Sequence, residues 1–233
     1  MNFVLKPEAE TDSKMFSLLN KTPEKNLLQF YNQALNEADK NSDIRQKLTA
    51  FNKVINFCSK DLGCLNDNSR KRDMVLYWTY NNIGDIFMTE AIKNKDVASY
   101  FDAEVNYQRA LNFSRNAEEK ISVLEKLAAL YLQYDDLSNY YEVKDSLIEV
   151  MPITARSEAF EKLADEAKDY NRKIYFLEKA LNFVNYEKVS AKLRCEQTIR
   201  LCEKLRDLYA DKKDYANLAR IEELRINTSY LIH

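Results

Sequence analysis

The chain has 233 residues, 31% of them charged with both signs interspersed, and its formal net charge is -2. This length suits one sizeable domain or a short helical solenoid, and the near-neutral balance argues against nucleic acid as a partner. Only two glycines and three prolines occur, so tight β-turns and glycine-rich phosphate loops have little to be built from. The sequence therefore predicts helices throughout.

Signals for membranes, export and disulfides are weak. No stretch approaches the roughly 20 apolar residues of a membrane-spanning helix, so no membrane partner is expected. Residues 1–7 hold only a three-residue apolar run and no cleavage-site pattern, which predicts a cytoplasmic protein or one exported by a route that leaves no such mark. Four cysteines are too few and too widely split for a disulfide framework, so reduced thiols are expected.

Apolar and aromatic residues recur at three- and four-residue steps along almost the whole chain, which predicts amphipathic helices. Residues 1–21 carry no such face and are expected to form an N-terminal extension, either flexible or docked on the rest. Residues 22–233 are expected to form a single helical domain. Five predicted hairpins pair residues 24–38 with 43–60, 71–93 with 97–114, 117–133 with 137–149, 154–169 with 171–184, and 187–211 with 214–226.

Polar residues at the breaks are typical of helix N-caps. Asn116, with Glu119 three residues later, resembles a capping box, and Ser42 and Asp214 are expected to cap the helices that follow them. These caps support the predicted helix starts.

An internal repeat is the strongest signal in the sequence. Residues 107–113 and 177–183 are near copies, and residues 51–57 are a looser third copy, each in a predicted second helix of a hairpin. The predicted first helices share an order of large residues around one small residue. The fullest examples are Tyr80, Ile83, Gly84 and Phe87, and Leu124, Leu127, Ala128 and Tyr131; weaker ones centre on Ala164 and Arg206.

This pattern resembles the tetratricopeptide repeat (TPR) family, whose first helix carries an aromatic residue, a Leu-Gly pair and a Tyr at that spacing. The resemblance implies an all-α, right-handed superhelical solenoid of about five antiparallel hairpins, with an irregular hairpin solenoid of another family as the rival. A small residue lets the two helices of a hairpin approach closely, which Gly84 and Ala128 allow. Arg206 does not, so the last hairpin is either divergent or a terminal cap.

In TPR proteins the residues three before and one after the small position line a concave groove. Carrying those positions over gives a set in which six of eight side chains are carboxylates. The set is Asn81, Asp85, Glu125, Ala129, Glu161, Asp165, Glu203 and Asp207. The resemblance thus implies an acidic groove that steers a basic peptide or helix to the protein, with ordinary solvated helix faces as the alternative. Trp78, out of phase with its apolar neighbours, is a candidate anchor.

Catalytic and metal-binding patterns are missing from the sequence. The only histidine is His233, which removes the usual general base and zinc ligand, so no enzyme activity, cofactor or metal is expected. The basic cluster at residues 69–72 is too short for phosphate tracking along nucleic acid. The acidic pairs Asp135-Asp136 and Glu222-Glu223 lie in a predicted loop and on a predicted helix surface, so only the abundance of carboxylates would support paired-carboxylate catalysis.

The sequence therefore predicts a non-enzymatic scaffold or adaptor that binds a protein or peptide partner. One alternative is a self-associating structural module whose groove is filled by residues 1–21 or by another copy. Another is a secreted bacterial effector of the same fold, suggested by Glu222-Glu223 and Leu231-Ile232 near the C-terminus. Neither the partner nor the oligomeric state is specified by the sequence.

Overall fold

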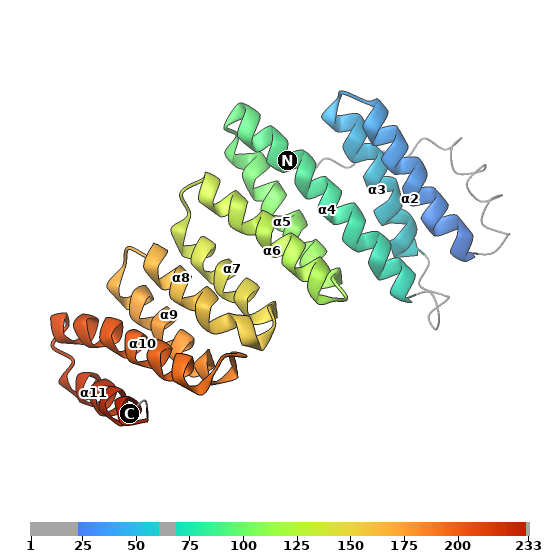
Figure 1. Cartoon of the computed structure of the whole chain (residues 1–233). Helices are drawn as coiled ribbons and strands as arrows, with labels where there is room; N and C mark the ends of the chain where they lie inside the picture. The colour runs from blue at the N-terminus through green and yellow to red at the C-terminus, as the bar shows by residue number, and fades with distance from the viewer. Residues whose placement is uncertain (1–22, 61–68, 232–233) are drawn as a thin grey trace, which may run out of the picture. The chain divides into compact units, whose positions relative to one another are not determined.

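The structure, a computed structural model, describes residues 23–60 and 69–231 (Figure 1). The predicted extension at residues 1–21 and the single histidine, His233, lie outside the described residues. Over the described ranges the chain is all-α, with two short 3-10 helices and no strand. No described helix is long and apolar enough to cross a bilayer.

The described helices follow the predicted order closely. They are α2 (Pro23–Lys40), α3 (Ile44–Lys60), α4 (Ser69–Asn94), α5 (Val97–Phe113), α6 (Ala117–Gln133), α7 (Leu137–Val150), η1 (Ile153–Ala155), α8 (Arg156–Glu166), α9 (Tyr170–Phe183), η2 (Val184–Tyr186), α10 (Ala191–Asp211) and α11 (Tyr215–Ser229). The prediction of an all-helical chain of hairpins is confirmed.

The largest boundary differences lie around α8 and α10. The helix predicted from residue 154 is preceded by η1 and ends at Glu166, because Ala167 adopts an extended backbone with φ -67° and ψ 135°. The helix predicted from residue 187 begins at Ala191 instead, where the Ser190 side chain caps it by accepting from the Leu193 N–H.

The chain divides into two compact units, residues 1–133 and residues 134–233. The boundary falls between α6 and α7, the helices that the sequence predicts to form the third hairpin. That hairpin, the single domain over residues 22–233 and the right-handed superhelix all involve both units. They stay predictions, and each unit is described by itself.

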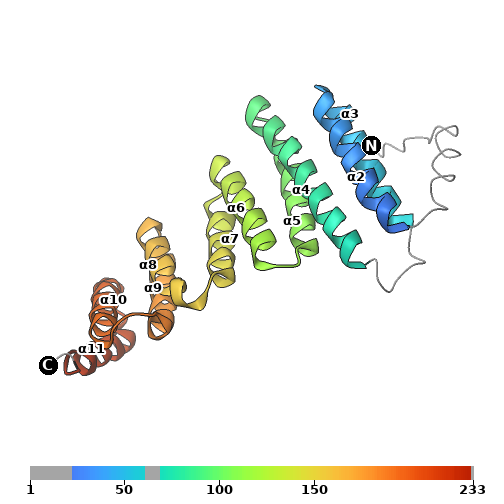
Figure 2. The same cartoon turned by 45° about the vertical axis from the view of Figure 1, so that its right-hand side comes forward.

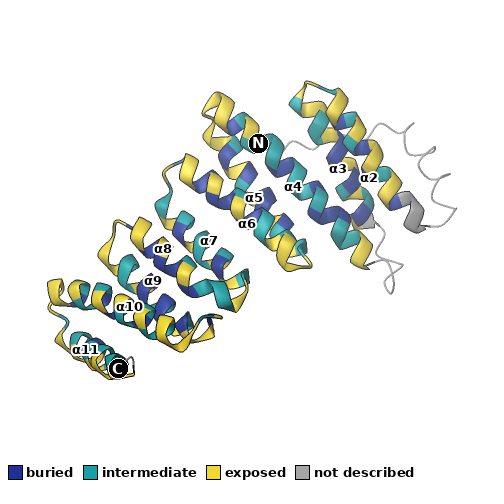
Figure 3. Ribbon diagram, in the orientation of Figure 1, coloured by how far each residue is buried: buried dark blue, intermediate teal, exposed yellow. Residues whose placement is uncertain are grey.

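In the first unit, α2 pairs with α3 and α4 with α5, and α6 packs on α5 and α4 (Figures 1 and 2). The 26-residue α4 also contacts α2 and α3, so its middle is shielded on several sides (Figure 3). The core of the first unit joins α2 and α3 to α4 through residues that include Tyr31, Phe51, Val54, Val75 and Ile83.

In the second unit, α8 pairs with α9 and α10 with α11, while α7 packs on α8 and α10 on α9 (Figure 2). Phe160, Leu163, Leu201, Leu205 and Ile221 are almost completely buried in its core. The last hairpin closes although Arg206 occupies the position where a small residue was expected. The Arg206 guanidinium hydrogen-bonds Asp207 and lies 3.8 Å from Glu222 of α11, so it stays outside the packed contact between α10 and α11.

The small position of the α4–α5 hairpin works as the sequence predicts. A Cβ atom on Gly84 would lie only 2.5 Å from Cε1 of Tyr107, a residue of α5 that is 1% exposed. Because no side chain fits between α4 and the Tyr107 ring, the absence of one at Gly84 is what lets the two helices pack.

Three turns between helices share the same backbone conformation and the same type of cap. Lys95, Asp135 and Lys213 have positive φ angles of 51°, 56° and 58°, and each directly precedes an aspartate that caps the next helix. Asp214 is therefore the cap that the sequence predicts.

The other two predicted caps differ in part from expectation. The cap of α3 is Asp43 and not Ser42, because the Arg45 N–H donates to Asp43 Oδ1 at 3.0 Å. Asn116 accepts from the Glu119 N–H at 2.8 Å, but the Glu119 carboxylate returns to the N–H of Arg115, one residue earlier than in a standard capping box.

Candidate functional site

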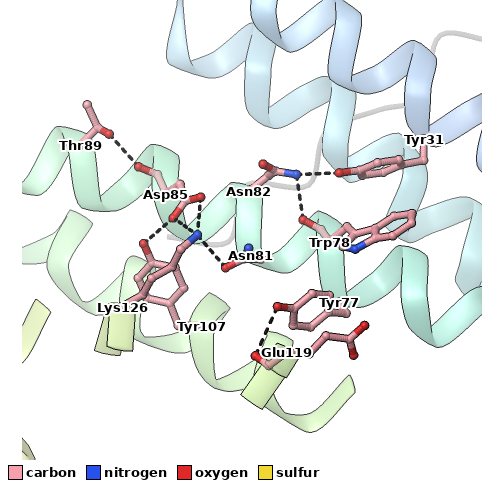
Figure 4. A network of polar contacts seen from close by, with 10 residues as sticks. All are labelled: Tyr31, Tyr77, Trp78, Asn81, Asn82, Asp85, Thr89, Tyr107, Glu119 and Lys126. Atoms are coloured by element: carbon pink, nitrogen blue, oxygen red, sulfur yellow. Dashed lines mark hydrogen bonds and ion pairs between the residues drawn. The ribbon is translucent and has the colours of Figure 1, made fainter. Parts of the chain in front are cut away.

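Successive first helices of the first unit are joined by a polar bridge (Figure 4). The Lys126 ammonium of α6 donates to both carboxylate oxygens of Asp85 on α4 at 2.7 Å, and to Asn81 Oδ1 at 3.0 Å. The Tyr107 hydroxyl of α5 donates to the same carboxylate at 2.8 Å. Asp85 therefore binds groups from two other helices.

Burial shapes this bridge. Burial first, and the neighbouring charge of Asp85 second, raise the pKa of Tyr107 well above its usual value, so its hydroxyl stays protonated and remains a donor. The side chains of Lys126 and Asp85 keep 31% and 44% of their exposure. Water screens such a pair, so its electrostatic part contributes only about 0–1 kcal/mol to stability. The bridge therefore specifies which side chains contact one another, and it adds little to the stability of the fold.

The second unit repeats the bridge at the same positions. Lys204 of α10 donates to both carboxylate oxygens of Asp165 on α8, at 2.8 and 2.9 Å. Asp85 and Asp165 each directly follow the small position of their helix, and Lys126 and Lys204 each lie two residues before it. The same register therefore joins α4 to α6 and α8 to α10.

Glu161 adds a buried ion pair to the α8–α10 bridge. The Arg200 guanidinium binds its carboxylate through two parallel hydrogen bonds of 3.0 and 2.6 Å, and Lys204 lies 3.0 Å away. Burial by itself raises the pKa of Glu161, but the hydrogen bonds from Arg200 and Lys204 outweigh it and hold the pKa below its usual value.

Polar contacts also link α2 to α4. Asn82, two residues before Gly84, donates to the Tyr31 hydroxyl of α2 at 2.8 Å. The ring centroid of Trp78 lies 5.4 Å from that of Tyr31 (Figure 4), and Trp78 is half-buried. Trp78 thus packs on a neighbouring helix of its own unit, and its role as a partner anchor stays a prediction.

The second helices of the second unit are joined as well. Lys179 of α9 binds Asp145 and Glu149 of α7, and the adjacent Glu178 of α9 binds Arg220 of α11. One helix thus presents a cation to the hairpin before it and a carboxylate to the hairpin after it.

The predicted groove residues fall into two groups. Asn81, Asp85, Glu161 and Asp165 take part in the bridges, and Asp207 pairs with the adjacent Arg206. Ala129, Glu125 and Glu203 are exposed. Over the part of the chain that the structure describes, neither of these two glutamates forms an ion pair. The first-helix faces therefore carry charge of both signs, and the free acidic groups are fewer than the sequence suggests.

Sequence reasoning missed the cations that bind these carboxylates. Lys126, Lys204 and Arg200 were not among the predicted site residues, because only the positions three before and one after the small residue were considered. The recurrence of lysine two residues before that position, in α6 and again in α10, was a readable signal.

A cleft of about 210 Å³ opens between α2, α3 and α4. Its floor is apolar and includes Phe51 and Ile86, and Asp39, Asp85 and Glu90 stand around it. Asp85 is shared with the Lys126 bridge. The cleft therefore adjoins the predicted groove at one side.

Groups able to hold a metal ion were not found in the residues that the structure describes. Cys58 and Cys202 are buried, and burial raises the pKa of the Cys202 thiol to about 11. A protonated, enclosed thiol is a poor nucleophile, so this cysteine is a packing residue.

Comparison with known proteins identifies no family for this chain. No family model and no curated protein matches the chain. Among solved structures it is similar to a Podosopora anserina kinesin light chain with nearly identical TPR-like repeats, with 12% sequence identity over 90% of this chain and 97% of that chain, and a TM-score of 0.34. A likeness at that TM-score carries no argument about fold or function.

Proposed function

We propose that this protein is a non-enzymatic interaction scaffold that binds a peptide or helix of a partner protein on the faces of its first helices. The observation that supports it most is the repeated bridge, Lys126 with Asp85 and Lys204 with Asp165. It holds α4 against α6, and α8 against α10, through side chains that are then occupied within the protein.

The bridges favour binding over catalysis for a physical reason. A carboxylate held by cations of its own fold is a poor proton acceptor, because hydrogen bonds to the charged form lower its basicity. Helices held in one register present their exposed side chains in a defined arrangement, which reduces the ordering cost of binding a partner.

The partner is expected to be basic where it meets these faces. Glu125 on α6 and Glu203 on α10 are exposed and outside the bridges, so their charges are available to steer a cationic peptide. Asp85, Glu161 and Asp165 contribute less, because their charges are already matched by Lys126, Arg200 and Lys204.

The test is affinity capture from a cell lysate, with mass spectrometry as the readout. The wild type is compared with a variant carrying Glu125→Lys and Glu203→Lys, and with a control carrying Asp102→Lys and Glu223→Lys. The control has the same change of charge, but on exposed positions of the second helices α5 and α11. Reversing Asp85, Glu161 or Asp165 is avoided, because it would place like charges beside the bridging cations.

The proposal expects a protein captured by the wild type and the control and lost by the Glu125/Glu203 variant. Its direct binding is then measured with purified components. Equal capture by all three proteins contradicts a role for the first-helix faces.

A further inference from the structure

The α2–α3–α4 cleft has the size of a side-chain site. Its volume of about 210 Å³ is below the roughly 300–1,000 Å³ of pockets that enclose whole small molecules or cofactors. The cleft is also open at one side rather than enclosed. A site of this size accepts one or two side chains of a peptide that lies across it.

The lining favours a cation with an apolar stem. The floor consists of buried Phe51 and Ala38 with half-buried Ile86, which suits methylene groups. Of the described residues around it, Asp39, Asp85 and Glu90 are acidic and Lys47 is the one base. Arginine and lysine combine an apolar stem with a cationic end, and each can lay the stem on such a floor.

Two of these carboxylates are available to a ligand. Asp85 is neutralised by Lys126, but Asp39 and Glu90 form no ion pair with any residue of the described ranges. Glu90 Oε2 accepts one hydrogen bond, from Asn94 at 2.8 Å, which leaves acceptor sites on the carboxylate. Asp39 belongs to α2 and Glu90 to α4, so the two acceptors stand on different helices.

The ends of two helices border the cleft. Ala38 and Asp39 lie in the last turn of α2, and the carbonyl end of a helix carries a negative partial charge. The first turn of α3, with Ile44 and Lys47, also borders the cleft and carries the opposite partial charge. The preference for a cation therefore rests on the carboxylates of Asp39 and Glu90.

We propose that the cleft between α2, α3 and α4 binds an arginine or lysine side chain of a peptide partner, held between Asp39 and Glu90 over the floor formed by Phe51 and Ile86. The site deepens the proposed function and rests on it, since it supplies a specific anchor beside the α4 face. Its occupation joins α2 to α4 in addition to the Asn82–Tyr31 hydrogen bond.

The test is an NMR titration of the ¹⁵N-labelled full chain with the blocked peptide acetyl-Gly-Leu-Arg-Leu-Gly-amide. The matched probe has citrulline, which is neutral and nearly isosteric, in place of arginine. The expected result is saturable shifts of the amide signals of Ser42, Lys47 and Thr89, with affinity for the citrulline peptide lower by about tenfold or more, because hydrogen bonds between charged groups are about twice as strong as neutral ones.

Two protein variants make the test specific. Asp39→Asn with Glu90→Gln removes both charges without changing side-chain shape and is expected to lower affinity for the arginine peptide by about tenfold or more. Asp102→Asn with Glu223→Gln makes the same change of net charge on exposed positions of α5 and α11 and is expected to leave the affinity unchanged.

Other outcomes overturn the proposal. These are equal affinity for the arginine and citrulline peptides, equal affinity of wild type and the Asp39/Glu90 variant, shifts confined to other helices, or no saturable binding. Binding that emerges only after deletion of residues 1–22 would assign the cleft to this chain's own N-terminal segment. Each of these leaves lysate capture through Glu125 and Glu203 intact, so the site and the proposed function fail separately.

Discussion

At the scale of single residues, Gly84 shows how closely two helices are fitted together. Its position on α4 leaves no room for a Cβ atom beside the Tyr107 ring, and that ring also carries the hydroxyl that binds Asp85. A change at Gly84 therefore affects both the helix packing and the bridge to α6.

Gly84→Ala is expected to destabilise the protein although alanine has the higher helix propensity. The added methyl group forces the buried ring of Tyr107 to move, at a cost of about 1–3 kcal/mol for overpacking. Urea denaturation measures the free energy of unfolding. Ala129→Leu, a larger change at an exposed position of α6, is the control and should alter it by no more than about 0.5 kcal/mol. A neutral or stabilising Gly84→Ala contradicts the packing described here.

Backbone conformation at Lys95 gives a prediction of opposite sign. This residue holds a φ of 51°, which costs a residue with a side chain about 1–2 kcal/mol relative to the right-handed region. Lys95→Gly relieves that cost and is expected to raise the midpoint of thermal unfolding. The same change at Lys120, an exposed position inside α6, is expected to lower the midpoint, because glycine inside a helix costs about 1 kcal/mol of stability. A fall in both variants would show that Lys95 is not strained.

At the scale of elements, the contacts between helices divide into apolar cores and ion pairs at their edges. The Glu161 pair differs from the others because its carboxylate is only 11% exposed while it binds Arg200 and Lys204. A buried carboxylate needs its cations, so the side-chain bridge between α8 and α10 depends on the ionisation of Glu161.

The contribution of the Glu161 carboxylate to stability changes with pH in a defined direction. The pKa of Glu161 is lower in the folded protein than in the unfolded chain, so its contribution to stability is present above the unfolded pKa of about 4.3. The contribution is lost as the pH falls through the folded value. Glu161→Gln is therefore expected to be less stable than wild type at pH 7, with the difference shrinking below about pH 4.

Urea denaturation at several pH values checks this expectation. Glu203→Gln, on an exposed side chain of α10, serves as the control and should show no such change. A difference between wild type and Glu161→Gln that is constant across the pH range contradicts the buried pair.

Local features of these elements were readable in the sequence, and distant partners were not. Helix order, hairpin lengths and the small residue at Gly84 follow from spacing along the chain, which is a local property. The contact of Trp78 with Tyr31 joins residues of different hairpins, so periodicity within α4 gave no sign of it. The same holds for Lys126, since which carboxylate a long side chain reaches depends on how helices stack.

At the scale of the whole molecule, the chain contains two compact units with separate apolar clusters. One cluster joins α2, α3 and α4, and the other lies within residues 134–233. Whether these units unfold separately bears directly on the single domain that the sequence predicts over residues 22–233.

Phe160→Ala is expected to destabilise the second unit selectively. Phe160 is completely buried, and such truncations cost about 3–5 kcal/mol. Hydrogen exchange resolved by residue should show faster exchange of core amides in α8–α11, with those of α2–α4 unchanged. Equal loss of protection in both units would support one cooperative domain instead.

The repeated register of the bridges also bears on how such a chain can lengthen. In the α8–α9 hairpin, Asp165 and Glu178 bind the hairpin that follows, Lys179 binds the helix that precedes, and Lys162 occupies the position that Lys126 and Lys204 use. This hairpin thus carries both halves of the lysine–aspartate bridge. A tandem copy of this hairpin would supply the lysine–aspartate bridge at the new junction, but the buried pair of Arg200 with Glu161 would have no counterpart, because Glu158 occupies the position of Arg200 in α8.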